Sequence, residues 1–341
     1  MITSYHLAAG GVLKQNLDDD EMRAAVRSGE GLLWVNLQKP TPDETFVLDE
    51  VFAFHPLAIE DCQHVSRYPK LDEYRDHLFL VILAPNPNFR PDKLPSGTDA
   101  GTGNASGNGD DDPTHEVDLF MGRNYVVSYC SAALPFVQVL LDRAKRDPKR
   151  GLGRGPAFLL HEIVDAAVDQ FFAMVDRIED EVEEAENKLQ EIGREEVLAH
   201  LLDLKRRVMR LRRQMSDHRE VIQRLMRLNH PVMSQETAPY FRDILDHLNQ
   251  IEDDLDVCRD TIDAARDVYL ALANTRTNEV IRVLTVLFTL TLPFAIMTSW
   301  FGMNFEHLPF HDHPHGAWIY TGIMTATSAG LLLWLRKREW F

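Results

Sequence analysis

Residues 283–301 read VLTVLFTLTLPFAIMTSWF and residues 317–335 read AWIYTGIMTATSAGLLLWL, and neither stretch contains a charged side chain. As an α-helix, each stretch is about 28 Å long, close to the ~30 Å hydrocarbon core of a bilayer. The sequence therefore predicts two transmembrane helices, because an isolated span must satisfy its backbone groups internally. Two buried core helices of a soluble protein are the alternative. The polar character of the remaining chain disfavours it, as do Trp300, Trp318 and Tyr320 near the ends of the stretches.

Basic residues flank the two stretches on one side. Arg282 precedes the first and Arg336, Lys337 and Arg338 follow the second, whereas residues 302–316 contain no lysine or arginine. By the positive-inside rule, both termini face the cytoplasm and residues 302–316 form an external loop. The first residues, MITSYHLAAGG, lack the basic segment and long apolar core of a cleavable signal. We therefore expect a multi-pass protein of the inner (plasma) membrane.

The composition excludes some classes of function. The 341 residues carry a net charge of −17, which argues against nucleic acid as a partner, because phosphate binding needs a basic surface. Cys62, Cys130 and Cys258 are scattered without metal-ligand spacing, so we expect reduced thiols in a cytosol.

A membrane-anchored enzyme is a second class to consider. The sequence has no convincing Ser-His-Asp, Cys-His, Walker or zinc-hydrolase pattern. Residues 151–156, GLGRGP, have the composition of a phosphate-binding loop, but they follow a basic helix-like stretch and lack the strand-turn-helix setting of such loops. We interpret them as a linker and expect no enzymatic activity.

Residues 1–155 predict a cytosolic domain that mixes helices and strands. Alternating or continuous apolar residues predict strands at 32–37, 77–83, 116–121 and 125–129. The residues GRN at 122–124 predict a hairpin between the last two. Residues 95–113 include SGTDAGTGNASGNGDDD, which is of low complexity and predicts a mobile insert.

Residues 156–280 predict long helices with one break, at residues 229–231, so we expect two of them. Apolar residues in the second recur in steps of three and four, which is typical of a heptad seam. They are Leu245, Leu248, Ile251, Leu255, Cys258, Ile262, Ala265, Tyr269 and Leu272. Up to Phe301 only Pro293 breaks the helical pattern, so we expect this helix to continue into the membrane. A helical hairpin beside a separate membrane anchor is the alternative.

Charged residues also cluster in this region. Residues 179–186 read EDEVEEAE, and residues 205–213 contain six lysines and arginines. Such blocks are typical of solvated helix faces, and we interpret them so in preference to metal binding.

Several short motifs of the chain point to one family of membrane proteins. GMNF at 302–305, between the two spans, resembles the filter segment of the CorA family of divalent-cation channels. NEVIRVLT at 278–285 is similar to its entry into the first span, and DVYL at 267–270 to its stalk. HPLAIEDC at 55–62, followed by RYPK at 67–70, resembles its N-terminal signature. The resemblance covers the chain from about residue 32 onward.

The resemblance implies an α+β/α membrane protein that forms a funnel-shaped homopentamer in contact with membrane lipid. Its parts would be a cytosolic α/β domain (1–155), long helices and stalk (156–280), a first transmembrane pore helix (281–301), an external loop (302–316), a second transmembrane helix (317–335) and a basic cytosolic tail (336–341).

It also implies a set of pore residues. These are a selectivity filter of Gly302, Met303 and Asn304, a pore entry at Asn278, and a hydrophobic gate at Leu284 and Leu292. Mg²⁺ prefers octahedral oxygen coordination and gives up its waters reluctantly, and a carboxamide oxygen can accept hydrogen bonds from those waters. A helix C-cap is the alternative role for Asn304. Rings of leucine gate by dewetting.

A regulatory site for cytosolic Mg²⁺ is implied at Asp267, whose bound ion would favour the closed state. The resemblance places a partner carboxylate after Leu83, where this chain has Asn86 and Asn88. Neutral amides bind divalent ions less strongly than carboxylates do, so this chain departs from the family pattern there.

The external loop leaves the transported ion open. Its possible metal contacts are Glu306, His307, His311, Asp312, His313 and His315. Imidazole suits Zn²⁺, Ni²⁺ or Co²⁺ better than Mg²⁺. We favour Mg²⁺ with Co²⁺ or Ni²⁺ as further cargo, and a Zn²⁺ transporter of the related ZntB type is the alternative. A two-span membrane sensor would explain the heptads but not Asn304.

Overall fold

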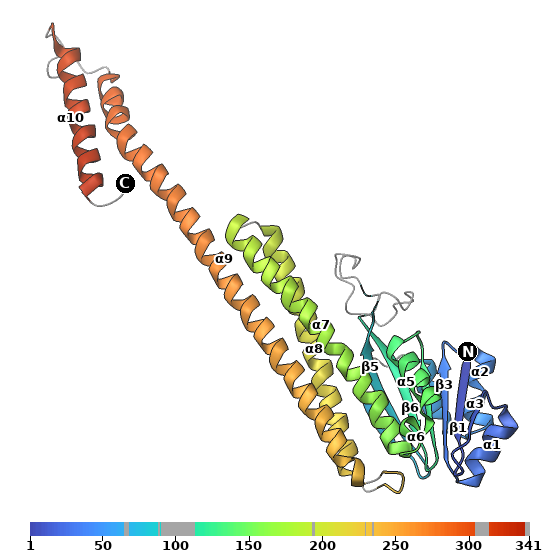
Figure 1. The fold of residues 1–341 in the computed structure, drawn as a ribbon. Coiled ribbons are helices and arrows are strands. Elements are labelled where there is room, and N and C mark those ends of the chain that lie inside the picture. The colour runs from blue at the N-terminus through green and yellow to red at the C-terminus, as the bar shows by residue number, and fades with distance from the viewer. Residues whose placement is uncertain are drawn as a thin grey trace. The chain divides into compact units, whose positions relative to one another are not determined.

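The computed structural model describes residues 1–64, 68–87, 89, 113–192, 195–228, 230–233, 235–303 and 314–337. The chain forms two compact units, Met1–Lys188 with Ala199–Asp263 and Leu189–Leu198 with Ala264–Phe341. The first contains a mixed sheet and long helices, and the second contains the apolar helices (Figure 1). The predicted insert at 95–113 lies outside the described residues except for Pro113.

Seven strands form one mixed sheet in the order β2-β1-β3-β7-β6-β5-β4. They are β1 (Ile2–Leu7), β2 (Leu13–Gln15), β3 (Leu32–Gln38), β4 (Lys70–Glu73), β5 (Leu78–Pro85), β6 (Thr114–Met121) and β7 (Tyr125–Cys130). Neighbouring described strands are antiparallel except β3 and β7, which are parallel. Strands β3, β5, β6 and β7 confirm the four predicted strands, and β6 and β7 form the predicted hairpin.

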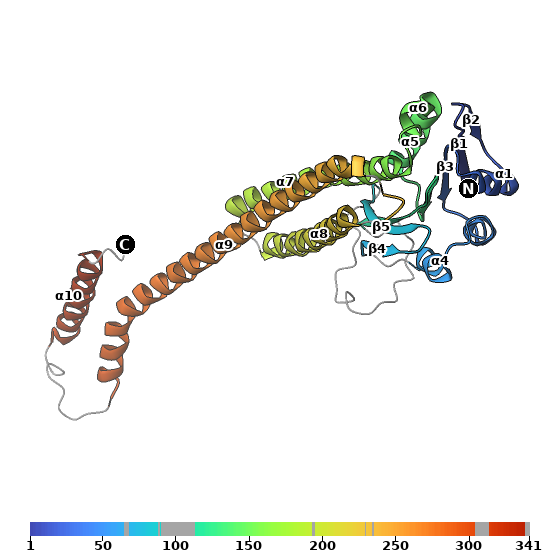
Figure 2. The same ribbon diagram turned by 90° about the horizontal axis from the view of Figure 1, so that it is seen from below.

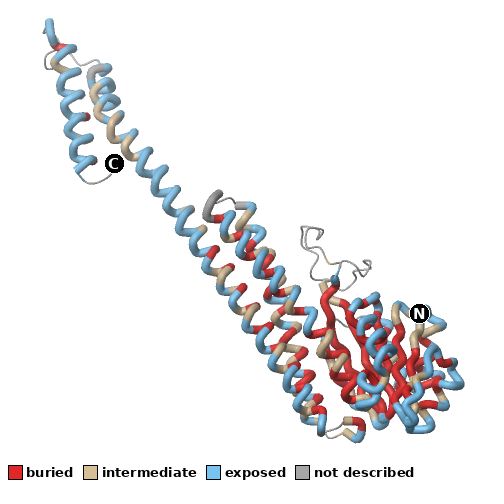
Figure 3. Tube along the Cα trace, viewed as in Figure 1, coloured by how far each residue is buried: buried red, intermediate tan, exposed pale blue. Residues whose placement is uncertain are grey.

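Helices cover both faces of the sheet (Figures 1 and 2). The short helices α1 (Asp19–Ser28), α2 (Pro42–Thr45), α3 (Val47–Glu50) and α4 (Pro56–Gln63) pack on one face, where the rings of Phe54 and Phe120 stack with centroids 4.0 Å apart. The long helices α7 (Pro156–Ile192) and α8 (Glu195–Arg227) lie on the other side. All eight residues of β5 are buried, which explains its continuous apolar sequence (Figure 3).

The remaining helices follow the sheet in the chain. They are α5 (Pro135–Arg146), α6 (Pro148–Gly151), the short 3-10 helix η2 (Gln235–Thr237), α9 (Ala238–Phe301) and α10 (Gly316–Lys337). Residues 152–155 join α6 to α7, in agreement with the predicted linker. α9 is one helix across Pro293, and both predicted apolar stretches are helical.

The prediction of two long helices before the membrane is wrong, because the described chain has three. α7 ends at Ile192 and α8 begins at Glu195, and the sequence has Gly193 directly after α7. Glycine commonly follows a helix end. One helix over 156–227 would be about 108 Å long. The reversal lets α7 and α8 bury their apolar faces together with α9.

Ion pairs fix the antiparallel register of α8 and α9. The pairs are Lys205 Nζ with Asp263 Oδ1 at 2.5 Å, Arg212 Nε with Asp256 Oδ1 at 2.7 Å and Arg219 Nη1 with Glu252 Oε2 at 2.8 Å. Arg207 also pairs with Glu181 of α7. Several charges that the sequence assigned to solvated faces therefore join helices.

The predicted seam of α9 is confirmed in its central part. Six of its residues are buried, namely Leu248, Ile251, Leu255, Cys258, Ile262 and Ala265. Leu245 and Tyr269 are half-buried, and Leu272 is 42% exposed. The seam thus holds the three-helix packing of the first unit up to Ile262, near the end of that unit at Asp263.

His218 connects α8 to the sheet. Its Nε2 accepts a hydrogen bond from the Leu83 N–H at 3.0 Å, and its Nδ1 lies 2.7 Å from the Gln214 carbonyl oxygen. β4 pairs with β5 only as far as Val81, so Leu83 lies beyond that ladder. Burial lowers the pKa of His218 to about 4, which keeps the imidazole neutral and able to accept.

Candidate functional site

The C-terminal part of α9 is both apolar and exposed. Its most apolar window has a mean hydropathy of 2.1 and no buried residue, and the corresponding window of α10 has a mean hydropathy of 1.3 with 11% buried (Figure 3). Both helices have the length and composition of a membrane span. The alternative of buried core helices is wrong for the described chain, since such helices would be covered by protein.

Threonine hydroxyls in these helices bond to their own backbone. Thr285 Oγ1 donates to the Ile281 carbonyl oxygen and Thr289 Oγ1 to that of Thr285, each at 2.7 Å. Each of the other threonines in the two apolar segments also donates its hydroxyl to the carbonyl oxygen four residues earlier. These are Thr291, Thr298, Thr321, Thr325 and Thr327. No described threonine hydroxyl there requires water, which suits a surface outside water.

Three of the predicted site residues share one face of α9. At 100° per residue, Asp267 and Asn278 lie about 20° apart and Asn278 and Leu292 about 40° apart. Leu284 lies about 120° from Asn278. Leu284 is 46% and Leu292 58% exposed, so both are available for contacts outside their own chain.

The end of α9 defines the beginning of the predicted filter. The Gly302 N–H donates to the Thr298 carbonyl oxygen at 3.0 Å, and the Met303 N–H to that of Trp300 at 3.4 Å. A Cβ on Gly302 would lie 3.2 Å from the Thr298 oxygen, tighter than an ordinary contact. Glycine therefore lets the backbone turn closely after the helix.

Most predicted loop residues lie outside the described residues. These are Asn304, Glu306, His307, His311, Asp312 and His313. His315 is described, and its carbonyl oxygen accepts from the Trp318 and Ile319 N–H groups at 3.1 and 3.2 Å, at the start of α10. The filter, cap and loop roles of the other six stay predictions.

A second group of interest joins α7 to α9. Asp165 and Asp169 are one turn apart on α7 and face His247 on α9, with ligand atoms of all three within 4.8 Å of one another. His247 Nδ1 lies 3.5 Å from Asp169 Oδ1 and 3.8 Å from Asp165 Oδ1. Asp165 Oδ1 and His247 Nδ1 are buried atoms without a hydrogen-bond partner. Their unsatisfied lone pairs suit a cation.

The electrostatics of this cluster also favour a bound cation. The pKa of Asp165 is raised, mainly by burial and then by the neighbouring carboxylate of Asp169, while His247 acts in the opposite direction. A divalent ion would offset the repulsion between the two carboxylates. Carboxylate oxygens suit Mg²⁺, and the imidazole extends the set toward Co²⁺, Ni²⁺ or Zn²⁺.

Asp267 is exposed and is not part of this cluster. Asn86 is buried and its backbone bonds to Pro113 and Phe89, while Asn88 lies outside the described residues. The cluster of Asp165, Asp169 and His247 was not among the sequence predictions. The one sign of it in the sequence was the spacing of Asp165 and Asp169, which are four residues apart and therefore on one face of a helix. The pairing with His247 depends on how α7 and α9 pack.

A sheet-and-helix domain followed by two exposed apolar helices defines a soluble domain joined to two segments of membrane-spanning length. Residues 29–337 match the family model described as CorA-like Mg²⁺ transporter protein. The chain is 32% identical over 309 residues to the "Putative metal ion transporter YfjQ" of Bacillus subtilis, covering 90% of this chain and 89% of that protein. The chain therefore belongs to the CorA-like Mg²⁺ transporter family, and the predicted resemblance is confirmed.

Other relatives bear on fold and cargo. The "Cobalt/magnesium transport protein CorA" of Thermotoga maritima is 28% identical over 310 residues, 90% of this chain and 83% of that protein. The "Zinc transport protein ZntB" of Photorhabdus laumondii is 26% identical over 201 residues, 59% of this chain and 61% of that protein. The complete CorA structure from Methanocaldococcus jannaschii has the same fold, with a TM-score of 0.79 at 20% identity, covering 100% of this chain and 99% of that chain.

Proposed function

We propose that this protein is a divalent-cation channel of the plasma membrane that takes up Mg²⁺, with Co²⁺ or Ni²⁺ as further cargo. The observation that carries the proposal is the exposed apolar end of α9, which leads directly into the filter sequence that begins at Gly302. Five copies would bring five such helices around one pore. Residues 1–155 and 156–280 would be cytosolic, and both termini would face the cytoplasm.

In the proposed pore each site residue has a chemical task. Carboxamides of Asn304 would hold a hydrated ion at the external mouth through its waters, beside the backbone of Gly302 and Met303. A ring of carboxylates would hold the ion too firmly to release it. Leu284 and Leu292 would narrow an apolar section that empties of water when closed. Asn278 would receive the ion at the cytosolic end.

The Asp165–Asp169–His247 cluster supplies a site for cytosolic metal in this proposal. Binding of Mg²⁺ there would tie α7 to α9, while Asp267 remains a candidate regulatory contact on the face shared with Asn278. Loss of internal Mg²⁺ would release these contacts and favour opening, since a ligand shifts a conformational equilibrium by its differential affinity.

Uptake into liposomes tests the proposal. Purified protein should carry Mg²⁺ into vesicles, and Asn304→Ala should lower the flux on the order of tenfold or more, equivalent to about 1.4 kcal/mol in the barrier. Gln250→Ala, which removes an exposed amide from the part of α9 that lies in the first unit, is the matched control and should retain most flux. Wild-type vesicles without divalent flux would instead favour the two-span sensor.

Zn²⁺ transport is the second candidate. It is supported by the imidazoles between residues 307 and 315 and by the ZntB relatives. Competition between Mg²⁺ and Zn²⁺, measured with and without a pH gradient, separates the candidates. Mg²⁺ uptake that is unaffected by the gradient supports the first proposal, and Zn²⁺ uptake that depends on the gradient supports the second.

A further inference from the structure

Helices α5 and α6 carry a basic surface that neither the proposed pore nor the metal cluster uses. Residues 143–154 read RAKRDPKRGLGR, with six cationic side chains and one carboxylate. The whole chain, by contrast, has a net charge of −17. Such a local concentration of positive charge points to an anionic ligand.

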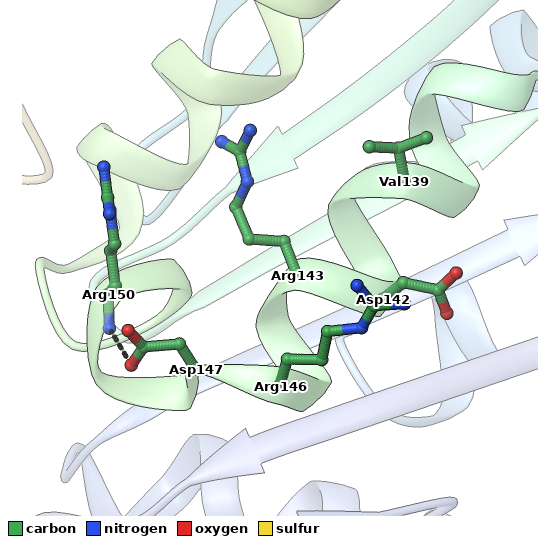
Figure 4. Close-up of a pocket in the computed structure, with 6 residues that line it drawn as sticks. All are labelled: Val139, Asp142, Arg143, Arg146, Asp147 and Arg150. Carbon is green, nitrogen blue, oxygen red and sulfur yellow. Dashed lines mark hydrogen bonds between the residues drawn. The ribbon is translucent and has the colours of Figure 1, made fainter.

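Part of this surface is hollowed into a pocket of about 510 Å³ (Figure 4). Its lining residues are Val139, Asp142, Arg143, Arg146, Asp147 and Arg150. The volume is in the range of small-molecule sites. Figure 4 shows the side chains of Arg143, from α5, and Arg150, from α6, extending to the same side of the helices.

The three arginines of the pocket outnumber its two lining carboxylates, and they are only partly paired within the described chain. Arg143 reaches one carboxylate, that of Glu162, at 3.6 Å, and no ion pair joins Arg146 or Arg150 to a carboxylate of the described residues. The two lining carboxylates have other contacts. Asp147 Oδ1 accepts from the Arg150 backbone N–H at 3.2 Å and Asp142 Oδ1 from Gln138 Nε2 at 3.4 Å.

We propose that this pocket binds the phosphate groups of a small polyanion, such as pyrophosphate or a nucleoside triphosphate. The planar fork of a guanidinium matches two phosphate oxygens, and several forks on adjacent turns can hold linked phosphates. Val139 is 60% exposed at the edge of the pocket and offers an apolar contact to a base or sugar. The proposal does not require transport, so it stands apart from the channel function.

Isothermal titration of the full-length protein in detergent micelles tests this site, with sodium pyrophosphate, ATP and adenosine in metal-free buffer. Pyrophosphate and ATP should bind and adenosine should not. Equal affinities identify the phosphates alone as the ligand, and tighter binding of ATP adds the contact at Val139. The double variant Arg146→Gln/Arg150→Gln should weaken pyrophosphate binding by about tenfold or more.

The matched control is Lys145→Gln/Lys149→Gln, which removes the same charge from the same helices outside the pocket lining. It should weaken binding by less than about threefold. Equal losses in the two double variants would mean a diffuse electrostatic effect and would overturn the pocket. Absence of binding to the wild type would overturn it too, as would binding only to phosphatidylglycerol vesicles. The single variant Arg146→Gln serves as the test where the double variant shows an altered circular dichroism spectrum.

Discussion

Two buried titratable residues of the first unit respond to pH in opposite directions. Asp118 on β6 is 2% exposed, and its Oδ1 has no hydrogen-bond partner. Burial, reinforced by the carboxylate of Glu116, raises its pKa well above the ordinary value. The folded protein then keeps a proton that the unfolded chain releases, so stability falls as the pH rises above about 4.

Replacing Asp118 with asparagine should remove this cost. At pH 8 we expect Asp118→Asn to be more stable than the wild type by about 1 kcal/mol, or roughly 2–4 °C in Tm. The difference should shrink toward pH 5. Thermal unfolding followed by circular dichroism checks this, and a constant difference at every pH would contradict it.

The change of stability with pH has the opposite sign for His218, because burial lowers the pKa of its imidazole to about 4. The unfolded chain takes up the proton first, so stability should be lost as the pH falls from about 6.5 to about 4. His218→Leu leaves the Leu83 N–H unpaired and should cost about 1–3 kcal/mol at pH 7.

The matched control for this residue is His218→Gln, whose amide can accept from Leu83 without titrating. At pH 7 it should be more stable than His218→Leu. Between pH 6.5 and pH 4 it should lose less stability than the wild type. Urea unfolding at several pH values measures both effects. A glutamine variant with the acid sensitivity of the wild type would show that another group is responsible.

Among the elements, the α8–α9 interface contains ion pairs that differ in burial. The side chain of Glu252 is 9% exposed and its Oε1 has no hydrogen-bond partner, whereas Lys205 and Asp263 are 31% and 39% exposed. Removing the partner of a buried charge costs several kcal/mol, while most exposed pairs contribute about 0–1 kcal/mol.

We therefore expect Arg219→Met to destabilise the protein by about 2–4 kcal/mol and Lys205→Met by less than about 1 kcal/mol. Adding Glu252→Leu to Arg219→Met should recover much of the loss, because no buried charge then lacks a partner. Denaturant unfolding of the three variants decides this. Equal losses for Arg219→Met and Lys205→Met would contradict the difference in burial.

The elements also differ in how well the sequence predicts them. β3, β5 and β7 were predictable, because strands covered on both faces need nearly continuous apolar residues, and β6 was predictable from the alternation of apolar and polar residues over its first part. The central seam of α9 was predictable from its steps of three and four. The reversal after Ile192 was missed, because one glycine is a weak signal inside a long periodic pattern. The ion pairs could not be predicted, since Arg212 and Asp256 are 44 residues apart in sequence.

For the whole molecule, substitutions in the Asp165–Asp169–His247 cluster test the proposed regulation of flux by internal Mg²⁺. The double variant Asp169→Asn/His247→Gln should reduce the closing effect of internal Mg²⁺, because two of three ligand groups are weakened. We expect the internal Mg²⁺ concentration that halves liposome flux to rise by about tenfold or more. Asp246→Asn, which removes an exposed carboxylate next to His247, should change it little. Inhibition unchanged in the double variant would exclude the cluster as the sensor.

The predicted site was only partly accessible to sequence reasoning. Short motifs led to the family and to the predicted filter that begins at Gly302, because those residues lie together in the chain. The cluster of Asp165, Asp169 and His247 was missed, since its two halves meet only through helix packing. Asn304 and most of the loop stay predictions, because they lie outside the described residues.

The threonines of the apolar helices have a consequence for the passing ion. With its hydroxyl bonded to the backbone, Thr285 or Thr289 presents a methyl group to its surroundings, much as valine would. In the proposed channel, the hydroxyl protons of these threonines are therefore not free for water, and only lone pairs of their oxygens remain as acceptors. An ion that crosses the apolar section would keep the hydration shell it brings from the mouth, because these few acceptors cannot replace its full set of waters.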